Sequence, residues 1–228
     1  MFFTLNRFGK TLWHFLVWIK LSLPMINGLW HIFGLRSPRV TFFGGAKLHL
    51  ASPYAQAATK LAALLVYHGI SIITGGGAGI MEAAAIGARK GAIDGGNGED
   101  FVTNNLGIGV KGLEEGQIPS ACSSFIRVTN FVMRKWLMTH FSSAFIVFPG
   151  GVGTYDELSE ILTLMDTGKL GKHPMILYGK EYWTSFSEWV DDALRRGFIH
   201  PHIKEFFVIV DDIQTAYELI CTNCAENK

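Results

Sequence analysis

The chain has 228 residues, which is enough for one sizeable α/β domain or two small ones, with a core that needs no disulfide or metal. Hydrophobic residues make up 49% of the chain and charged residues 17%, which excludes disordered and collagen-like classes. The formal net charge of +1 gives no global attraction to nucleic acid, so an anion-binding site has to be local.

The N-terminal segment is apolar, and we expect residues 1–36 to form a helical extension. Residues 11–33 are strongly apolar, but Lys20 and Pro24 interrupt them. The unbroken run Leu12–Ile19 is too short for a bilayer span, which needs about 20 apolar residues. The extension is expected to pack on the body of the protein or on a partner subunit, with an interfacial membrane anchor and a true span as the alternatives.

Charge is distributed unevenly along the chain. Seven basic residues and no acidic residue lie between Met1 and Met81. Either this stretch is mostly core, or its basic N-terminus is attracted to the anionic headgroups of a membrane surface. Because Cys122, Cys221 and Cys224 give no disulfide framework, we predict a cytoplasmic protein, with peripheral membrane contact through the N-terminal segment.

From Arg39 onward, apolar strands alternate with helices. Ser52 and Pro53 supply the N-cap and the first-turn proline of one helix, and Gly69 ends it. The expected strands cover residues 39–43, 70–74, 106–110, 125–128, 144–148, 175–178 and 207–210. The expected helices cover residues 53–68, 80–91, 131–141, 154–167, 182–196 and 213–222. This alternation predicts one α/β domain, residues 37–228, whose parallel sheet is covered by helices on both faces.

Two glycine-rich turns, residues 75–79 and 150–153, each follow a predicted strand and precede a predicted helix. Both turns therefore lie at the carboxyl edge of the sheet, where open parallel sheets bind ligands. The N–H groups of helix N-termini and the close approach that glycine permits favour a phosphate site there. The alternative is that the glycines only make tight turns. Neither turn matches the dinucleotide fingerprint, so no cofactor is predicted.

The segment Pro149–Glu157 fits the pattern P-G-G-x-G-T-x-x-E, and Met133-Arg134-Lys135 precedes it on the previous predicted helix. Together with the glycine loop Thr74–Glu82, these motifs resemble the LOG ("lonely guy") family, whose members are often labelled lysine decarboxylases. The resemblance runs from about Arg39 to Ile220. One departure is Phe131-Val132, where many plant-type members carry a polar or charged pair, and it weakens the case for a cytokinin nucleotide as the substrate.

The resemblance implies a Rossmann-like, doubly wound fold that is usually dimeric. It also implies hydrolysis of the N-glycosidic bond of a nucleoside 5′-monophosphate, AMP-like or a cytokinin riboside monophosphate, to free base and ribose 5-phosphate. A non-catalytic nucleotide-binding or sensing module is the alternative. A pyridoxal phosphate-dependent decarboxylase is disfavoured, because no lysine lies in an evident Schiff-base setting.

Glu157 and Arg134 are the expected catalytic residues. A carboxylate stabilises the oxocarbenium-like ribose and orients or deprotonates the attacking water, and an arginine binds phosphate or ribose through two parallel hydrogen bonds. The expected substrate-binding residues are Gly150, Gly151, Gly153 and Thr154 for the phosphate, with Gly76, Gly79, Met81, Glu82, Met133 and Lys135 as further contacts.

Structural alternatives stand beside these assignments. Thr154-x-x-Glu157 fits a capping box, in which the glutamate would only cap the helix. Arg134 and Lys135 fit an ordinary solvated helix face, and Glu82 fits an acidic residue near a helix N-terminus. His200-Pro201-His202 is interpreted as a surface loop, and no metal is predicted.

Overall fold

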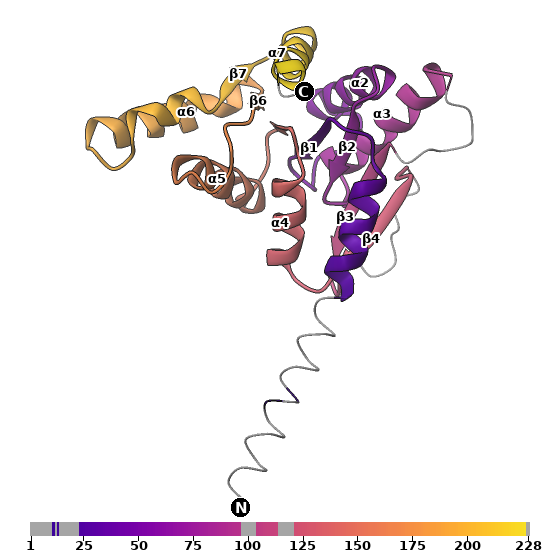
Figure 1. Ribbon diagram of the computed structural model, residues 1–228. Helices are drawn as coiled ribbons and strands as arrows, with labels where there is room; N and C mark the ends of the chain where they lie inside the picture. The colour runs from indigo at the N-terminus through magenta and orange to yellow at the C-terminus, as the bar shows by residue number, and fades with distance from the viewer. Residues whose placement is uncertain (1–10, 12, 14–22, 97–103, 114–120, 227–228) are drawn as a thin grey trace, which may run out of the picture.

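The computed structural model describes residues 11, 13, 23–96, 104–113 and 121–226. Seven parallel strands form one sheet in the order β4-β3-β2-β1-β5-β6-β7. The strands are β1 (Arg39–Phe43), β2 (Ser71–Thr74), β3 (Asn105–Val110), β4 (Ser124–Val128), β5 (Ala144–Val147), β6 (Met175–Tyr178) and β7 (Val208–Val210). The predicted α/β class and the doubly wound parallel sheet are confirmed (Figure 1).

Helices cover both faces of the sheet, as the apolar strands require, and β2, β3, β5 and β6 are buried along their whole length. They are α2 (Pro53–Tyr67), α3 (Ile80–Asp94), α4 (Phe131–His140), α5 (Val152–Asp166), α6 (Lys180–Arg195) and α7 (Ile213–Glu226), with the short 3₁₀ helix η1 (Pro201–Glu205). The core on one face is shared with α2, α3 and α7, and the core on the other face with α4, α5, α6 and η1. Each expected strand and helix is present, with ends that match the expected limits or differ from them by a few residues.

Local sequence signals account for several of the helix ends. Ser52 is the N-cap of α2, where its side chain accepts a hydrogen bond from the N–H of Ala55, and Pro53 occupies the first turn. Gly69 follows the helix with a φ of +82°, a left-handed conformation that suits glycine. At the start of α4, the side chain of Asn130 accepts from the N–H of Met133, although this cap was not anticipated from the sequence.

Residues 23–34 are helical and pack on the body of the domain. Ile32 is fully buried and joins the core beneath α4 and α5, as does Leu35. The helix crosses close to α4, because a side chain at Gly28 would meet Leu137 at 2.6 Å. Of the predicted extension, residues 1–10, 12 and 14–22 lie outside the described residues, and the predicted boundary at residue 37 stays a prediction.

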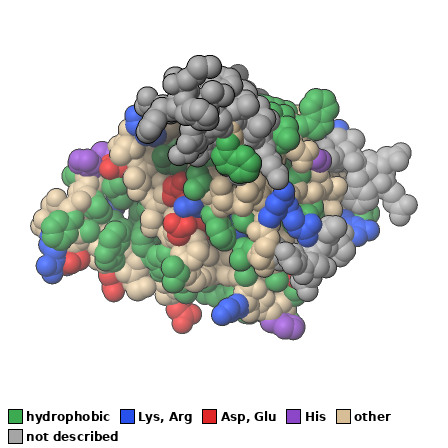
Figure 2. Space-filling model, turned by 90° about the horizontal axis from the view of Figure 1, so that it is seen from below, with side chains coloured by type: hydrophobic (Ala, Val, Ile, Leu, Met, Phe, Trp, Pro, Cys, Tyr) green, Lys and Arg blue, Asp and Glu red, His purple; other side chains and the backbone are tan. Residues whose placement is uncertain are grey.

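The same helix also presents apolar side chains outward. Leu23, Ile26, Trp30 and Phe33 are each at least 58% exposed. Figure 2 looks at the molecule from below and shows hydrophobic side chains spread among scattered charged ones on the side of the molecule that is visible. None of the described helices is long and apolar enough to cross a membrane.

Candidate active site

A cavity of about 440 Å³ lies where the strand order reverses. The chain leaves β1 toward β2 on one side and returns to β5, on the other side of β1, only after β4 and α4. Such a reversal opens a crevice beyond the carboxyl ends of the strands, where α/β proteins bind ligands. Residues 44–47 after β1, the first turns of α4 and the first turns of α5 line the cavity, together with Met81.

The N-terminal end of α5 supplies an anion site to this cavity. Gly151 is its N-cap, and no side chain caps the helix. Gly151, Val152 and Gly153 all line the cavity. The first turn therefore presents backbone N–H groups and the positive end of the helix dipole to a ligand.

The expected start of α5 at residue 154 is wrong by two residues, and this removes one alternative for Glu157. Thr154 lies inside the first turn and is buried, so it does not occupy the N-cap position that a capping box requires. Glu157 falls in the second turn and lines the cavity. Its carboxylate is therefore available to a ligand.

Arg134 projects from α4 into the same cavity and is only 8% exposed. Its Nη2 atom lies 3.7 Å from Oε1 of Glu157 and 3.9 Å from Sδ of Met81. Its Nε atom is buried without a hydrogen-bond partner. A buried guanidinium with an unused donor is costly, so this side chain is prepared for an anionic ligand rather than for solvent. The solvated helix face proposed as the alternative for Arg134 does not fit this burial.

The first glycine loop makes room for Arg134. A Cβ atom at Gly75 would lie 1.8 Å from Nη2 of Arg134 and 2.7 Å from its Cζ. The loop therefore serves the site by leaving space for a cation, in addition to making a turn. Gly79 has a φ of +67°, and a Cβ atom there would lie 2.3 Å from the carbonyl oxygen of Gly45, so this glycine sets how closely the two loops approach.

Burial has the largest effect on the pKa of Glu157, whose side chain is 15% exposed. Removal from water raises the pKa of its carboxyl group from 4.5 to about 7, although the nearby Arg134 opposes the shift. A carboxyl group with a pKa near neutrality exchanges protons readily at physiological pH, which suits a general base or acid.

Lys135 is held by acidic partners on α5. Its Nζ atom lies 3.0 Å from Oδ2 of Asp156 and 2.8 Å from Oε2 of Glu160. Burial lowers the pKa of Lys135, but its hydrogen bonds to Glu160 and Asp156 raise it above the ordinary value on balance. The residue thus ties α4 to α5 and neutralises the acidic groups beside the cavity.

The structure brings seven of the predicted site residues to the cavity wall. These are Met81, Arg134, Lys135, Gly151, Gly153, Thr154 and Glu157. Gly76, Gly79, Glu82, Met133 and Gly150 are not part of that wall. Gly150 directly precedes the lining residue Gly151, and its carbonyl oxygen accepts a hydrogen bond from the hydroxyl of Tyr182.

Several lining residues were not anticipated from the sequence. They are Gly44, Gly45, Ala46, Lys47, Phe131, Val152 and Asp156. Gly44-Gly45 follows β1 directly, and this third glycine pair at the carboxyl edge of the sheet is the sequence signal that could have predicted them. Lys47 comes two residues later, and it adds a cation to the cavity wall.

Within the described part of the chain, one group of three metal-ligating side chains occurs, and it lies away from the cavity. It consists of Asp166, at the C-terminal end of α5, with His200 and His202. The cavity wall offers Asp156 and Glu157 as its acidic groups and Lys47, Arg134 and Lys135 as its cations. This set suits a phosphorylated organic anion.

Comparisons with known proteins agree with the geometry. Residues 81–220 match the protein family described as "possible lysine decarboxylase". The chain is 32% identical over 187 residues to the probable cytokinin riboside 5′-monophosphate phosphoribohydrolase LOGL3 of Oryza sativa subsp. japonica, covering 81% of this chain and 82% of the relative. It is also 32% identical over 184 residues to the cytokinin riboside 5′-monophosphate phosphoribohydrolase LOG3 of Arabidopsis thaliana, covering 80% of each.

Among solved structures, the molybdenum cofactor carrier protein of Chlamydomonas reinhardtii superposes with a TM-score of 0.58. That likeness covers 83% of this chain and 99% of the carrier at 19% identity, and it concerns the fold alone. The family match over residues 81–220 and the two plant relatives, taken with the Pro149–Glu157 motif and Arg134 at one cavity, lead to one conclusion: the chain belongs to the LOG family.

Proposed function

We propose that the protein hydrolyses the N-glycosidic bond of a nucleoside 5′-monophosphate, releasing the free base and ribose 5-phosphate. The observation that carries the proposal is the pairing of Glu157 and Arg134 across 3.7 Å beside an uncapped helix N-terminus. The relatives at 32% identity are named for this reaction, which favours turnover over a binding or sensing role.

The 5′-phosphate would bind at the N-terminal end of α5. Gly151 and Gly153 line the cavity there, and the structure has no atom within 4 Å of a Cβ placed at either one. A phosphate oxygen can therefore approach the backbone N–H groups closely. Lys47 and Arg134 would neutralise its charge from the sides.

Bond cleavage would leave positive charge on the ribose ring. The C1′–N bond breaks with its electron pair going to the base, and water forms the new C1′–O bond and gives a proton to the carboxylate of Glu157. The departing base takes up a proton from solvent, and Glu157 returns its proton to solvent. The ionised carboxylate also stabilises the oxocarbenium-like ribose at the transition state. Arg134 keeps Glu157 ionised in part, because its cation opposes the effect of burial on the carboxyl pKa.

The base would lie toward α4. Phe131 lines the cavity, is 50% exposed and lies with its ring 5.9 Å from Cζ of Arg134. An aromatic face suits stacking with a purine. We propose an AMP-like substrate, with cytokinin riboside monophosphate as the second candidate because the plant relatives are named for it.

Incubation of the purified protein with AMP, GMP, IMP, CMP and UMP, followed by chromatography for free base, tests the proposal. We expect base release from at least one of these nucleotides and much slower release from adenosine, which lacks the phosphate. Equal cleavage of adenosine and AMP would overturn the phosphate assignment. Tight nucleotide binding without any base release would favour the sensing module.

The outward apolar side chains of residues 23–34 indicate a surface that another molecule or a membrane covers. We propose that the protein acts in the cytoplasm as a homo-oligomer and that this helix contacts an anionic membrane surface peripherally. Support comes from four exposed apolar side chains on a helix within a stretch, Met1 to Met81, that holds no acidic residue.

A further inference from the structure

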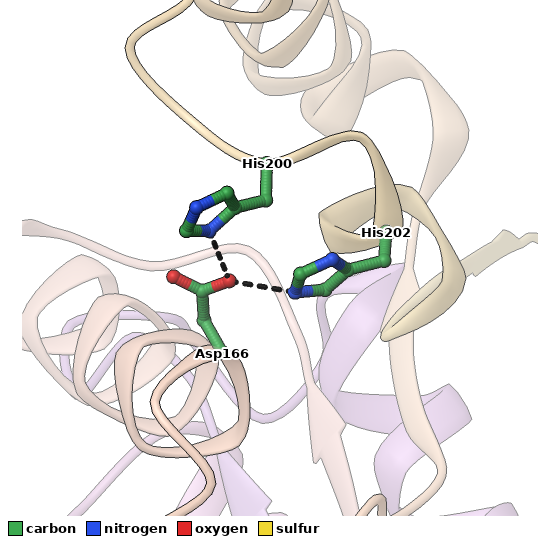
Figure 3. A group of neighbouring side chains, drawn as sticks. All are labelled: Asp166, His200 and His202. Carbon is green, nitrogen blue, oxygen red and sulfur yellow. Dashed lines mark hydrogen bonds and ion pairs between the residues drawn. The ribbon is translucent and has the colours of Figure 1, made fainter.

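Two imidazole rings converge on one carboxylate oxygen at the far end of α5. Oδ1 of Asp166 lies 2.9 Å from Nδ1 of His200 and 2.7 Å from Nε2 of His202 (Figure 3). The three potential ligand atoms all lie within 4.8 Å of one another. We propose that Asp166, His200 and His202 bind a divalent first-row transition metal ion, with Zn²⁺ as the best fit.

The donor set selects the class of metal. Two imidazole nitrogens and one carboxylate oxygen suit zinc and its neighbours, whereas magnesium and calcium prefer oxygen ligands throughout. Zinc bonds of about 2.0–2.1 Å in a tetrahedral arrangement place neighbouring ligand atoms about 3.3 Å apart. The observed spacings of 2.7 and 2.9 Å need to open by about half an ångström. Side-chain rotation alone can supply this movement.

The backbone holds the two histidines at a fixed spacing. Pro201 separates them and occupies the first position of η1, so its φ is restricted. The two rings are nearly parallel, with an interplanar angle of 10° and centroids 5.2 Å apart. Phe206 is buried, and its ring contacts the ring of His202 edge-on at 5.3 Å. A core residue therefore supports the ring of His202, and the ring of His200 stacks on it from the solvent side.

The carboxylate side is also prepared for a cation. Asp166 is the last residue of α5, where the negative end of the helix dipole attracts positive charge. Its side chain is 21% exposed, whereas those of His200 and His202 are 69% and 45% exposed. Solvent can therefore reach the ion and fill its remaining coordination positions.

The site would act as a structural link. It joins the C-terminal end of α5 to the segment that connects α6 with β7, positions separated by more than 30 residues in sequence. Glu157 lies nine residues earlier on the same helix, about 14 Å away at 1.5 Å per residue. The ion is therefore not expected to touch a bound nucleotide, and this proposal does not depend on the hydrolase activity.

The test uses the full chain, stripped of metal with a chelator and dialysed. Zinc binding is measured by calorimetry and by competition with a chromophoric chelator. We expect one Zn²⁺ per chain and a higher melting temperature with zinc. The variants Asp166→Asn, His200→Asn and His202→Asn should each weaken zinc binding about tenfold or more, since even outer-shell changes cost 10- to 100-fold.

Two controls separate this site from other zinc binders. His68→Asn removes an exposed histidine from the end of α2 and should leave zinc binding unchanged. Cys221→Ser with Cys224→Ser tests the cysteine pair near the C-terminus, and Co²⁺ bound to that variant should show visible d–d bands without a thiolate charge-transfer band. Zinc binding that is absent from the wild type, or equal in the wild type and the three ligand variants, would overturn the proposal.

Discussion

The carboxyl group of Glu157 lies where burial favours its protonated form, whereas the proposed reaction requires the ionised form. Its pKa is raised to about 7, so the fraction of ionised enzyme increases as pH rises through neutrality. We predict that kcat/KM for AMP rises with pH from about 5.5 and levels off above about 8. The measurement is the pH profile of initial rates at low substrate concentration.

The phosphate of AMP also titrates, with a second pKa near 6, and this needs a separate control. The affinity of Glu157→Gln for AMP, measured across the same pH range, reports the phosphate alone. After that correction, a wild-type profile that is flat or that falls as pH rises would contradict the role of the Glu157 carboxylate.

Substitution of Glu157 separates chemistry from binding and stability. Glutamine keeps the shape but cannot accept the proton or carry the charge, so Glu157→Gln should lower kcat on the order of 10²–10⁴ while AMP binding changes little. Glu188→Gln is the control, because Glu188 is exposed on α6 and does not line the cavity. Turnover close to that of the wild type in Glu157→Gln would contradict the catalytic role of Glu157.

The same variant should change how stability depends on pH. Because the folded-state pKa of Glu157 is raised, folding is favoured by this group below about pH 4.5, and the benefit is lost as pH rises to about 7. This pKa shift lowers the free energy of unfolding by on the order of 3 kcal/mol between these two pH values. Chemical denaturation should therefore show Glu157→Gln gaining stability relative to the wild type between about pH 5 and about pH 8, and a constant difference would contradict the shift.

Gly75 gives a test of Arg134 that leaves the arginine itself in place. The φ of Gly75 is negative, so alanine is allowed by the backbone, but its Cβ would lie 1.8 Å from Nη2 of Arg134. We predict that Gly75→Ala displaces the guanidinium and lowers kcat/KM at least about tenfold. Gly171→Ala is the control, since its nearest contact would be 3.6 Å away. Equal kinetics in the two variants would contradict the role of Gly75.

At the scale of elements, the sequence pattern predicted the sheet and its helices because each strand is an apolar run bounded by turn residues. Arg39–Phe43 and Met175–Tyr178 match their predicted limits. The start of α5 was placed too late because Val152-Gly153 was interpreted as part of the glycine turn. Tertiary structure decides this end, since the loop is held by contacts to the turn after β1 and to α6. The N–H of Gly45 donates to the carbonyl of Pro149, and the hydroxyl of Tyr182 donates to the carbonyl of Gly150.

The parts of the site that escaped prediction are those that depend on contacts distant in sequence. The space that Gly75 leaves for Arg134 joins residues 59 positions apart, and no local pattern reports it. The two histidines around Pro201 were visible as a pair, but the carboxylate of Asp166 that faces them comes from another element. The order of the strands brings side chains together that are distant in sequence. The sequence alone predicted only that the two glycine turns meet at the carboxyl edge of the sheet.

Tyr182 connects α6 to the glycine turn of residues 150–153, the proposed phosphate-binding loop, and should act as a positioning residue. Its hydroxyl donates to the carbonyl of Gly150, directly before the N-cap of α5. We predict that Tyr182→Phe raises KM for AMP several-fold with a smaller effect on kcat, because the loop that holds the phosphate loses one hydrogen bond of about 1 kcal/mol. Tyr67→Phe, at an exposed position on α2, is the control. A change confined to kcat would contradict this assignment.

At the scale of the whole molecule, the helix of residues 23–34 has two apolar faces, one packed on the domain and one exposed. Met25, Leu29 and Ile32 pack inward, which means that deletion of residues 1–36 would remove part of the core. The outward face carries Trp30, which is 80% exposed, and Ile26, which is 60% exposed. A test of this face therefore requires point substitutions rather than truncation.

We predict that Ile26→Ser combined with Trp30→Ser abolishes flotation with anionic vesicles and leaves base release from AMP unchanged, because the site lies beyond the carboxyl ends of β1 and β5. Binding should be weaker for neutral vesicles and at high salt, since basic residues add attraction to anionic headgroups. Phe198→Ser, at a position 76% exposed and far from this helix in sequence, is the control. A double variant that still floats would contradict membrane contact, and one whose mass in solution falls to that of a single chain would assign the face to a subunit interface instead.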